Sequence, residues 1–235
     1  MRALSPADCL ALWESGQALH PLDQGLLAIQ TAFPEARSAS VADWPLGRRN
    51  RALAELRCDT FGRWIKGWAA CEQCGEKLEF SLDGDALRTS ATPDPDTAIH
   101  VGEKIFRLPT SRDLANLSDE SDPSAAALRL LKLCALPDSS SLPECSESEV
   151  DVISDRMAEA DPLADILLHF DCPGCGHSFE HSLDLASFLW SEIEGRAKRL
   201  MLDVHTLALA YGWSEAEILR LTDARRDFYL QMVRA

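Results

Sequence analysis

Two Cys-x-x-Cys-Gly motifs, far apart in the chain, constrain this sequence more than any other feature. They are Cys71-Glu-Gln-Cys74-Gly75 and Cys172-Pro-Gly-Cys175-Gly176, with 97 of the 235 residues between Cys74 and Cys172. Two residues between cysteines let both sulfurs reach one ion at about 2.3 Å, and glycine tolerates the positive φ of a tight turn. Four thiolates suit tetrahedral zinc. Cys71, Cys74, Cys172 and Cys175 are therefore predicted to bind one structural zinc ion per chain.

Cysteines in this pattern also serve iron–sulfur clusters and dithiol redox chemistry. An iron–sulfur cluster also takes four cysteine ligands. Cys-Pro-Gly-Cys resembles a dithiol redox motif, but a thioredoxin-type site needs one such motif opening a helix, and strand-like residues flank this one. Three nearby histidines are alternative ligands: His169, His177 and His181. His181, however, is two residues from both Phe179 and Leu183, so it is expected to pack with them on one face of a strand. The remaining cysteines, predicted to be small buried or incidental residues, are Cys9, Cys58, Cys134 and Cys145.

The net negative charge of the chain argues against nucleic acid as a partner. Lys and Arg total 23 against 38 Asp and Glu, a net charge of −15, which a nucleic-acid backbone would repel unless a local basic patch exists. The sequence has no apolar run of about 18 residues, so no membrane span is expected. Asp8 and Glu14 interrupt the N-terminal apolar stretch, unlike in a signal peptide. The expected location is the cytoplasm, where paired cysteines more often bind metal than form disulfides.

The N-terminal residues 1–69 are predicted to form a helical unit. One helix begins after Ser5-Pro6 and ends at Gly16, and a second covers residues Pro21 to Phe33. A third helix is expected from Arg48 to Trp68, leading directly into the first cysteine turn. Its apolar residues form one stripe at helical spacing: Leu53, Leu56, Phe61, Ile65 and Trp68.

Residues 70–185 are predicted to form a zinc-ribbon-like β unit. Apolar and polar residues alternate over 77–83, and Asp83-Gly84 offers a hairpin turn into a strand near 85–90. Further strands are expected over 101–108, 166–170 and 179–185, giving one antiparallel sheet held by zinc. An acidic insertion at about 107–160 is expected to hold helices that begin near Ser111, at Asp122-Pro123, and after Ser146, with a flexible loop at 137–146.

Two charged stretches each allow more than one interpretation. Residues 117–165 hold 12 acidic and 3 basic side chains, as in a solvated insertion or an acidic docking surface. Residues 48–66 have a net charge of +4, as in a solvated helix face, a partner-docking face or, least favoured, a nucleic-acid site.

The C-terminal residues 186–235 are predicted to form a second helical unit. A stripe from Leu189 to Tyr211 indicates a long helix that ends at Gly212. Ser214 and Glu217 form a capping box for the next helix, and Thr222 or Asp223 begins the last one. The predicted fold class is therefore α+β, with N- and C-terminal helical units around a small antiparallel sheet.

No phosphate loop, dinucleotide-binding glycine pattern or hydrolase motif occurs in the sequence, so nothing positive argues for an enzyme. The chain nevertheless resembles a known family. The resemblance rests on ALWESG (11–16), DWPLGRRNRALAELR (43–57) followed by FG (61–62), the CEQC turn (71–74) leading into LEF (78–80), RLPTSRDL (107–114), DPLADILLHFDCPGCGH (161–177), LDLASFLWSEI (183–193) and VHTLALAYGWSEAEILRLTDARRDFYL (204–230). These segments look like bacterial and phage proteins grouped with the T4-type phage baseplate protein, and together they span nearly the whole chain.

The resemblance implies a non-enzymatic role in a contractile tail or phage-like injection system. The chain would be an assembly chaperone of the baseplate hub or a minor structural subunit, with hub or spike proteins as partners and no small-molecule substrate. The family supplies no catalytic residues to carry over. The competing hypotheses are a zinc-ribbon regulator that binds nucleic acid and, less favoured, a thiol oxidoreductase.

Overall fold

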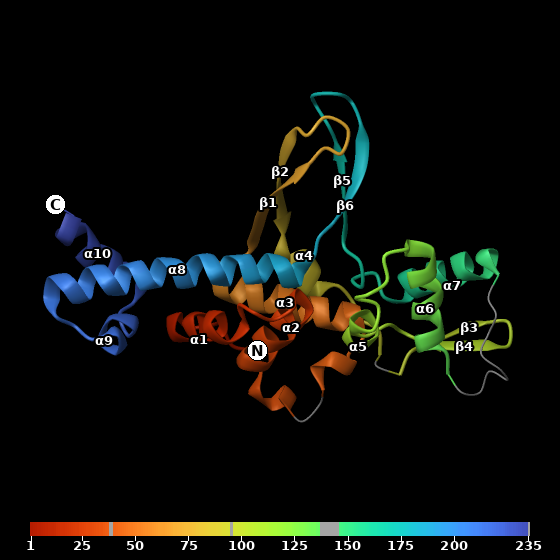
Figure 1. The fold of residues 1–235 in the computed structure, drawn as a ribbon, viewed down its shortest axis with the longest axis horizontal. Helices are drawn as coiled ribbons and strands as arrows, with labels where there is room; N and C mark the ends of the chain where they lie inside the picture. Colours follow the sequence, from red (N-terminus) through yellow and green to blue (C-terminus); the bar gives the residue numbers. More distant parts are fainter. Residues whose placement is uncertain (38–39, 95, 137–145, 235) are drawn as a thin grey trace.

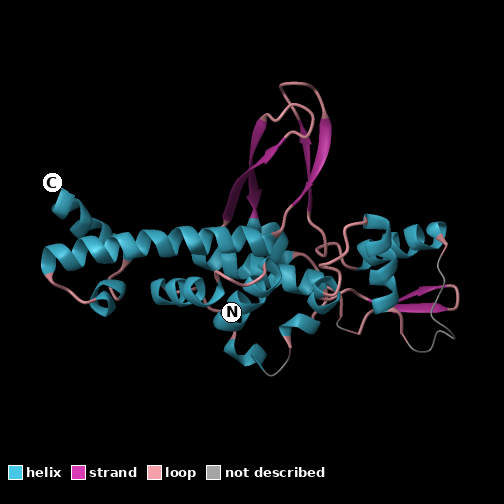
Figure 2. Ribbon diagram, in the orientation of Figure 1, coloured by secondary structure: helices cyan, strands magenta, loops and turns pink. Residues whose placement is uncertain are grey.

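A computed structural model describes residues 1–37, 40–94, 96–136 and 146–234. The fold is α+β, as predicted, and combines helices with small antiparallel sheets (Figure 2). The single sheet expected from the sequence is wrong, because the described strands form three separate two-stranded sheets. No helix in these ranges is long and apolar enough to cross a membrane.

A helical body forms the centre of the molecule (Figure 1). Its helices are α1 (Pro6–Gly16), α2 (Pro21–Ala32), α3 (Leu46–Phe61) and the first half of α8 (Leu185–Tyr211), with the short 3₁₀ segments η1 (Pro34–Arg37) and η2 (Val41–Asp43). The N-terminal prediction of Ser5 as cap and Pro6 in the first turn is confirmed. The main core joins Leu53 and Leu56 of α3 to Leu189 and Ile193 of α8. Residues of the predicted N-terminal unit (1–69) and of the predicted C-terminal unit (186–235) thus share one core.

The helix predicted over 48–68 is wrong in its last third. Helix α3 ends at Phe61, and Gly62 follows with φ +98°, a backbone conformation that favours glycine. The chain then becomes strand β1 (Trp64–Ala70), in which Ile65 and Ala69 are buried and Trp64 and Trp68 are exposed. Ile65 and Trp68 fit a helical stripe by spacing alone, but cross-strand pairing determines their conformation.

Two hairpins rise from the body side by side and form a projection, here called the stalk (Figure 1). In the first hairpin β1 pairs with β2 (Lys77–Asp83), and in the second β5 (Leu167–Asp171) pairs with β6 (Ser178–Ser182). Their facing sides meet through Phe80 and Phe170, whose ring centroids are 6.0 Å apart. The strands predicted on both sides of the second cysteine motif are therefore confirmed.

The hairpin turn predicted at Asp83-Gly84 is wrong. Asp83 instead caps the short helix α4 (Gly84–Thr89) by accepting a hydrogen bond from the Asp85 N–H group. A Cβ atom at position 84 would clash with the Cys58 sulfur and the Arg63 carbonyl oxygen. The glycine is thus explained by close packing, and the strand predicted near 85–90 does not form.

The insertion has its own small core. It contains the hairpin of β3 (Ala98–Val101) and β4 (Lys104–Arg107), where one strand was predicted over 101–108, and the helices α5 (Ser111–Ala115), α6 (Pro123–Cys134) and α7 (Glu147–Ala160). Phe106, Leu131 and Ile153 are buried together in this core. The predicted start of α7 is confirmed by a Ser146–Glu149 capping box. Most of the predicted flexible loop, at 137–145, lies outside the described residues.

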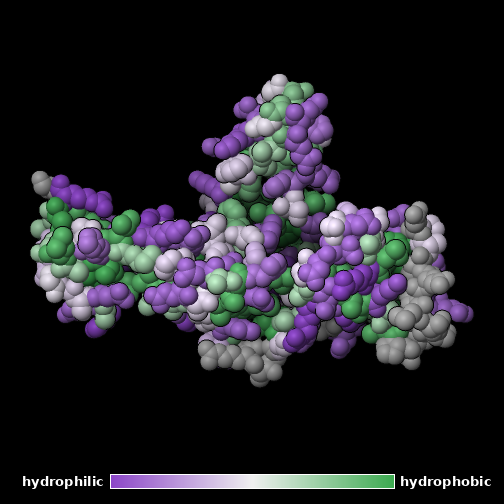
Figure 3. All heavy atoms as spheres, viewed as in Figure 1, coloured by the Kyte–Doolittle hydropathy of each residue, from purple (hydrophilic) through white to green (hydrophobic). Residues whose placement is uncertain are grey.

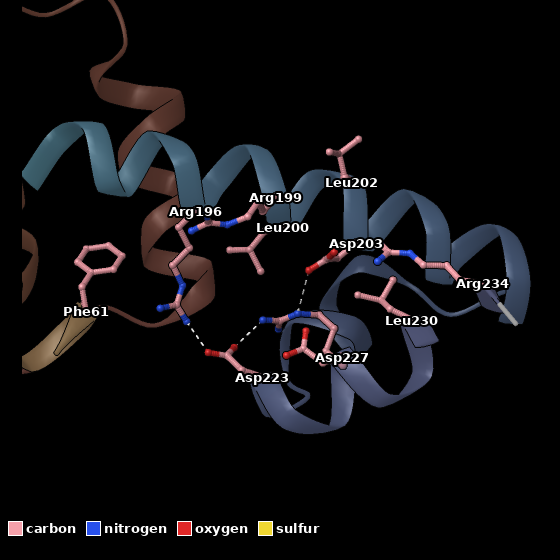
Figure 4. A pocket seen from close by; sticks show the side chains of 11 residues that line it. Phe61, Arg196, Arg199, Leu200, Leu202, Asp203, Asp223, Asp227, Leu230 and Arg234 are labelled. Atoms are coloured by element: carbon pink, nitrogen blue, oxygen red, sulfur yellow. Dashed lines mark hydrogen bonds and ion pairs between the residues drawn. The ribbon is translucent and has the colours of Figure 1, made fainter. Parts of the chain in front are cut away.

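The second half of α8 extends beyond the body and, with α9 (Glu215–Leu219) and α10 (Asp223–Arg234), forms a projection here called the arm. Gly212 ends α8 at φ +69°, and Ser214 and Glu217 form the predicted capping box. A groove between α8 and α10 is lined by a chain of ion pairs (Figure 4). In it Asp223 bridges Arg196 of α8 and Arg226 of α10, and Arg226 also pairs with Asp203 at 3.3 Å.

The basic stretch 48–66 is not simply a solvated helix face. Arg57 is buried, pairs with Glu192 at 2.7 Å, and donates to the carbonyl oxygens of Gly62 and Trp64. Arg49 is also buried and donates to the side chain of Asn50 and to the Ser111 hydroxyl of α5. Burial lowers the pKa of Arg49. Two of these arginines therefore stabilise the junctions between α3 and its neighbours.

Candidate metal centre

Each Cys-x-x-Cys motif forms the turn of one stalk hairpin, and the two turns have the same geometry. The N–H group of Cys71 donates to the Glu76 carbonyl oxygen at 2.8 Å, and that of Cys172 donates to His177 at 2.9 Å. The following glycines close both turns with φ +76° at Gly75 and +74° at Gly176. The sequence prediction that glycine serves a positive-φ turn here is confirmed, and each turn presents two sulfurs on one side.

The structure brings the four predicted ligands together from two hairpins that are far apart in sequence. All four sulfurs lie within 4.8 Å of one another, and no other such cluster is found in the described ranges. The Sγ–Sγ distance is 3.7 Å for Cys71–Cys175 and 3.5 Å for Cys74–Cys172. Sulfurs about 2.3 Å from one tetrahedral ion are about 3.8 Å apart. The sulfurs are also much farther apart than the roughly 2.05 Å of a disulfide bond.

Burial and charge fit a cation at the centre. Cys71 and Cys172 are buried with Phe179 and Ala69, whereas Cys74 and Cys175 face solvent. Burial opposes ionisation of Cys71, but hydrogen bonds from the backbone N–H groups of Cys74 and Gln73 lower its pKa to about 7. The Glu76 N–H group favours the Cys74 thiolate, yet the neighbouring thiols Cys175 and Cys172 raise its pKa to about 12. A divalent cation removes this competition because it stabilises all four thiolates.

The three nearby histidines do not join the cluster. His169 Nδ1 lies 3.0 Å from Glu180 across the β5–β6 pair, and the His177 ring stacks on Phe179. His181 is exposed, so the expectation that it packs on a strand face is wrong. Four thiolates complete a tetrahedral shell and leave no open coordination position, which is typical of a structural metal site.

The cysteines outside the motifs do not contribute to the site. Cys9, Cys58 and Cys134 are buried in separate parts of the chain, as predicted, and Cys145 lies outside the described residues. Burial raises the pKa of Cys9 to about 11 and that of Cys134 to about 12, so both thiols are neutral near pH 7.

Sequence reasoning missed the first strand of the site, β1, which positions Cys71. The signal was present in the chain: Trp64-Ile-Lys-Gly-Trp-Ala-Ala precedes the first motif just as Leu167-Leu-His-Phe-Asp precedes the second. Both segments are rich in residues that favour strands, and equivalent turns need equivalent flanking strands. Each pair of sulfurs is therefore held by two strands, one on either side of its turn.

No family model, curated protein or solved structure matches the chain. The site is therefore characterised by its own geometry: a four-cysteine cluster that can hold a metal ion, at the tip of two paired hairpins.

Proposed function

We propose that this chain is a non-enzymatic assembly factor or minor structural component of the baseplate hub in a phage-like contractile tail or injection system. The observation that carries the proposal is the resemblance of the sequence segments given above to the T4-type baseplate family. Two of them, 161–177 and 204–230, include the second cysteine turn and the arm. The resemblance thus includes the parts of the molecule that project most.

The shape of the molecule supports a role in binding other proteins. The stalk, the arm and the insertion extend from the helical body in different directions (Figure 1). Hydrophobic residues are also exposed on the arm (Figure 3), where Leu209 and Phe228 are 81% and 61% accessible to solvent. Exposed apolar side chains that cluster on a soluble protein are typical of interaction sites. A scaffold with several contact surfaces fits an assembly role.

The metal in this proposal is one structural zinc ion per chain, bound by Cys71, Cys74, Cys172 and Cys175. Zinc stabilises four thiolates in a closed tetrahedral shell and has no redox chemistry of its own. The four cysteines would then fix residues 64–83 and 167–182 to each other as one stalk. Elemental analysis of the purified protein distinguishes zinc from iron, and an iron–sulfur cluster would add visible absorbance.

The test of the function is a tagged pull-down from the native host during particle production, with mass spectrometry of the eluate and of finished particles. Hub or spike proteins in the eluate, with this chain absent from particles, identify an assembly chaperone. This chain in both samples identifies a structural subunit. Capture of neither hub nor spike proteins overturns the proposal.

A second candidate function, binding of single-stranded nucleic acid by the stalk, is favoured by one observation. Trp64 and Trp68 are 52% and 56% exposed on one face of β1, with Lys66 between them. Successive bases stack on such aromatic side chains, and cations neutralise the phosphates. The net charge of −15 opposes this role. Affinity that falls steeply with salt and is lost in Trp68→Ala would favour it over the baseplate proposal.

A thiol oxidoreductase has less support. Each Cys-x-x-Cys motif lies in a hairpin turn, whereas a thioredoxin-type dithiol lies at the start of a helix. Reduction of insulin disulfides by the protein after metal removal would support that activity.

A further inference from the structure

A pocket on the helical body lies beside the first half of α3 and is here called the α3 pocket. Its volume is about 250 Å³, and its lining residues come from several parts of the chain that are far apart in sequence. Phe33, at the end of α2, and Trp44, just before α3, provide aromatic surface. Arg48 and Arg51 provide positive charge and lie three residues apart, on the same side of α3. The pocket thus joins an apolar surface to two guanidinium groups.

The two arginines of the α3 pocket have no acidic partner in the described structure. Both are half-buried, yet neither forms an ion pair or a side-chain hydrogen bond with a described residue. The other half-buried arginines of the described structure, Arg88, Arg107 and Arg196, pair with aspartates at 3.2, 2.6 and 2.9 Å. A guanidinium group that is partly shielded from water gains most from a carboxylate. Arg48 and Arg51 therefore have the environment of paired arginines without the pair.

The remaining charges of the pocket do not supply that carboxylate. Glu55 is the one acidic side chain among the lining residues, and it lies 3.8 Å from the N-terminal amino group. The Arg48 guanidinium stacks on the Trp44 ring, 4.3 Å from its centroid. Stacking fixes the plane of the guanidinium group and leaves the N–H groups at its edge free for a planar acceptor. The geometry favours a carboxylate from outside the chain.

The size of the pocket favours side chains of a protein over a complete small molecule. Sites for drug-sized ligands usually have a volume of about 300–1,000 Å³. The α3 pocket, at about 250 Å³, is smaller. An aromatic side chain can pack against Phe33 and Trp44, while a neighbouring carboxylate accepts hydrogen bonds from the arginines.

We propose that the α3 pocket binds an acidic segment of another protein in which a glutamate or aspartate lies next to an aromatic residue. The carboxylate lies beside Arg48 and Arg51, and the aromatic side chain lies against Phe33 and Trp44. This inference deepens the proposed function by giving the partner's chemistry, and rests on it only for the partner's identity.

The test uses the full chain, with its metal, and short synthetic peptides with Gly-Ser flanks. Their centres are Glu-Phe-Glu, Gln-Phe-Gln and Glu-Ala-Glu, so that one peptide lacks the charge and another lacks the ring. Isothermal titration calorimetry should show that Glu-Phe-Glu binds at least tenfold more tightly than either of the others. Equal affinity for Glu-Phe-Glu and either other peptide, or no saturable binding, overturns the proposal. Displacement of Glu-Phe-Glu by an equal concentration of inorganic phosphate would make the pocket a simple anion site and also overturn it.

Variants of the pocket separate binding from folding. Arg51→Gln is expected to weaken binding of the Glu-Phe-Glu peptide at least tenfold and to keep the wild-type melting temperature, because Arg51 has no ion pair to lose. Arg51→Glu should bind a Lys-Phe-Lys peptide in preference to Glu-Phe-Glu. The matched control is Arg225→Gln, which changes an exposed arginine of the arm and should bind as wild type. Wild-type binding in Arg51→Gln contradicts the proposal.

The same variants distinguish failure of this inference from failure of the proposed function. If wild-type protein captures hub or spike proteins and Arg51→Gln captures them equally, the α3 pocket is not their site, although the function stands. If wild-type protein captures none while the Glu-Phe-Glu peptide binds as expected, the pocket stands and the function fails. A dimer that Arg51→Gln abolishes would make a second copy the occupant and overturn the assignment to another protein.

Discussion

The stalk and the arm both project from the same helical body, yet different forces hold them together. The buried cluster at the stalk tip consists of Ala69, Cys71, Cys172 and Phe179, so two of its four residues belong to the four-cysteine cluster that can hold a metal ion. The arm buries Leu207, Ile218 and Leu230, and the rings of Trp213 and Tyr229 pack against them. The proposed metal would therefore stabilise the stalk tip, whereas side-chain packing and helix caps stabilise the arm.

This difference has a functional consequence. A metal-closed hairpin pair is rigid because its strands are joined at both ends, to the body below and to the ion above. The arm has only a small core, so it can adjust to a partner at little cost. We infer that the stalk sets geometry and that the arm contributes contact surface.

The largest expected effect comes from Cys172→Ser. Loss of one thiolate should abolish metal binding, because structural zinc contributes about 10–16 kcal/mol of binding free energy at such sites. Limited proteolysis should then cleave within 64–83 and 167–182 while α9 and α10 stay protected. Cys58→Ala, which changes a cysteine outside the cluster, serves as the control and should keep the metal. A proteolysis pattern that Cys172→Ser leaves unchanged would refute the idea that the stalk depends on the ion.

Arg57→Ala tests the base of the stalk, where Arg57 joins β1 to the helical body through an ion pair and hydrogen bonds. The change leaves Glu192 and the carbonyl oxygens of Gly62 and Trp64 without their partner. Removing one member of a buried ion pair costs about 3–5 kcal/mol of unfolding free energy. Chemical denaturation measures the loss, and the matched control is Arg51→Ala, an arginine of the same helix. A similar loss of unfolding free energy in Arg51→Ala would contradict this account, because the cost would then not come from the ion pair between Arg57 and Glu192.

Leu207→Ala tests the arm core. Leu207 is fully buried, and its truncation should cost about 2–5 kcal/mol through lost contacts and a cavity. Hydrogen exchange should rise in α9 and α10 while the metal content stays at the wild-type value. Leu209→Ala, on the exposed side of the same helix, should change stability by about 0.5 kcal/mol or less. Metal loss in Leu207→Ala would contradict the independence of the two projections.

Ser214→Ala gives the smallest expected effect. Its hydroxyl accepts a hydrogen bond from the Glu217 N–H group, and Ser214 also donates to the Glu217 carboxylate at 2.7 Å. Loss of such a cap costs about 1 kcal/mol. The cost should appear as faster exchange in α9 alone, and Ser214→Asp should restore most of the protection. No local change in exchange would mean that packing of Ile218, not the cap, determines this helix.

Local signals in the sequence predicted the elements that depend on local interactions. Ser5-Pro6, Ser146 with Glu149, and Ser214 with Glu217 each begin a helix because the capping bonds join residues three apart. The four candidate metal ligands were predictable for the same reason, since each turn holds its own two cysteines. The pairing of the two turns followed from the chemistry of zinc rather than from any local pattern.

The errors arose where distant contacts override local spacing. Ile65 and Trp68 fit a helical stripe, but pairing with Leu82 and Glu79 places them in a strand. Arg57 looked like part of a solvated basic face because its partner, Glu192, is 135 residues away in the sequence. Residues brought together by the tertiary fold give no sign of this in a single sequence.

The most direct test of the central claim is hydrogen exchange of the stalk in the wild-type protein before and after removal of the metal. Native mass spectrometry should show one zinc ion per chain in the starting material. Chelation should then raise exchange across β1, β2, β5 and β6 and leave the buried part of α8 protected. A metal-free chain with stalk protection equal to that of the starting material would contradict the claim that the four cysteines close the stalk through an ion.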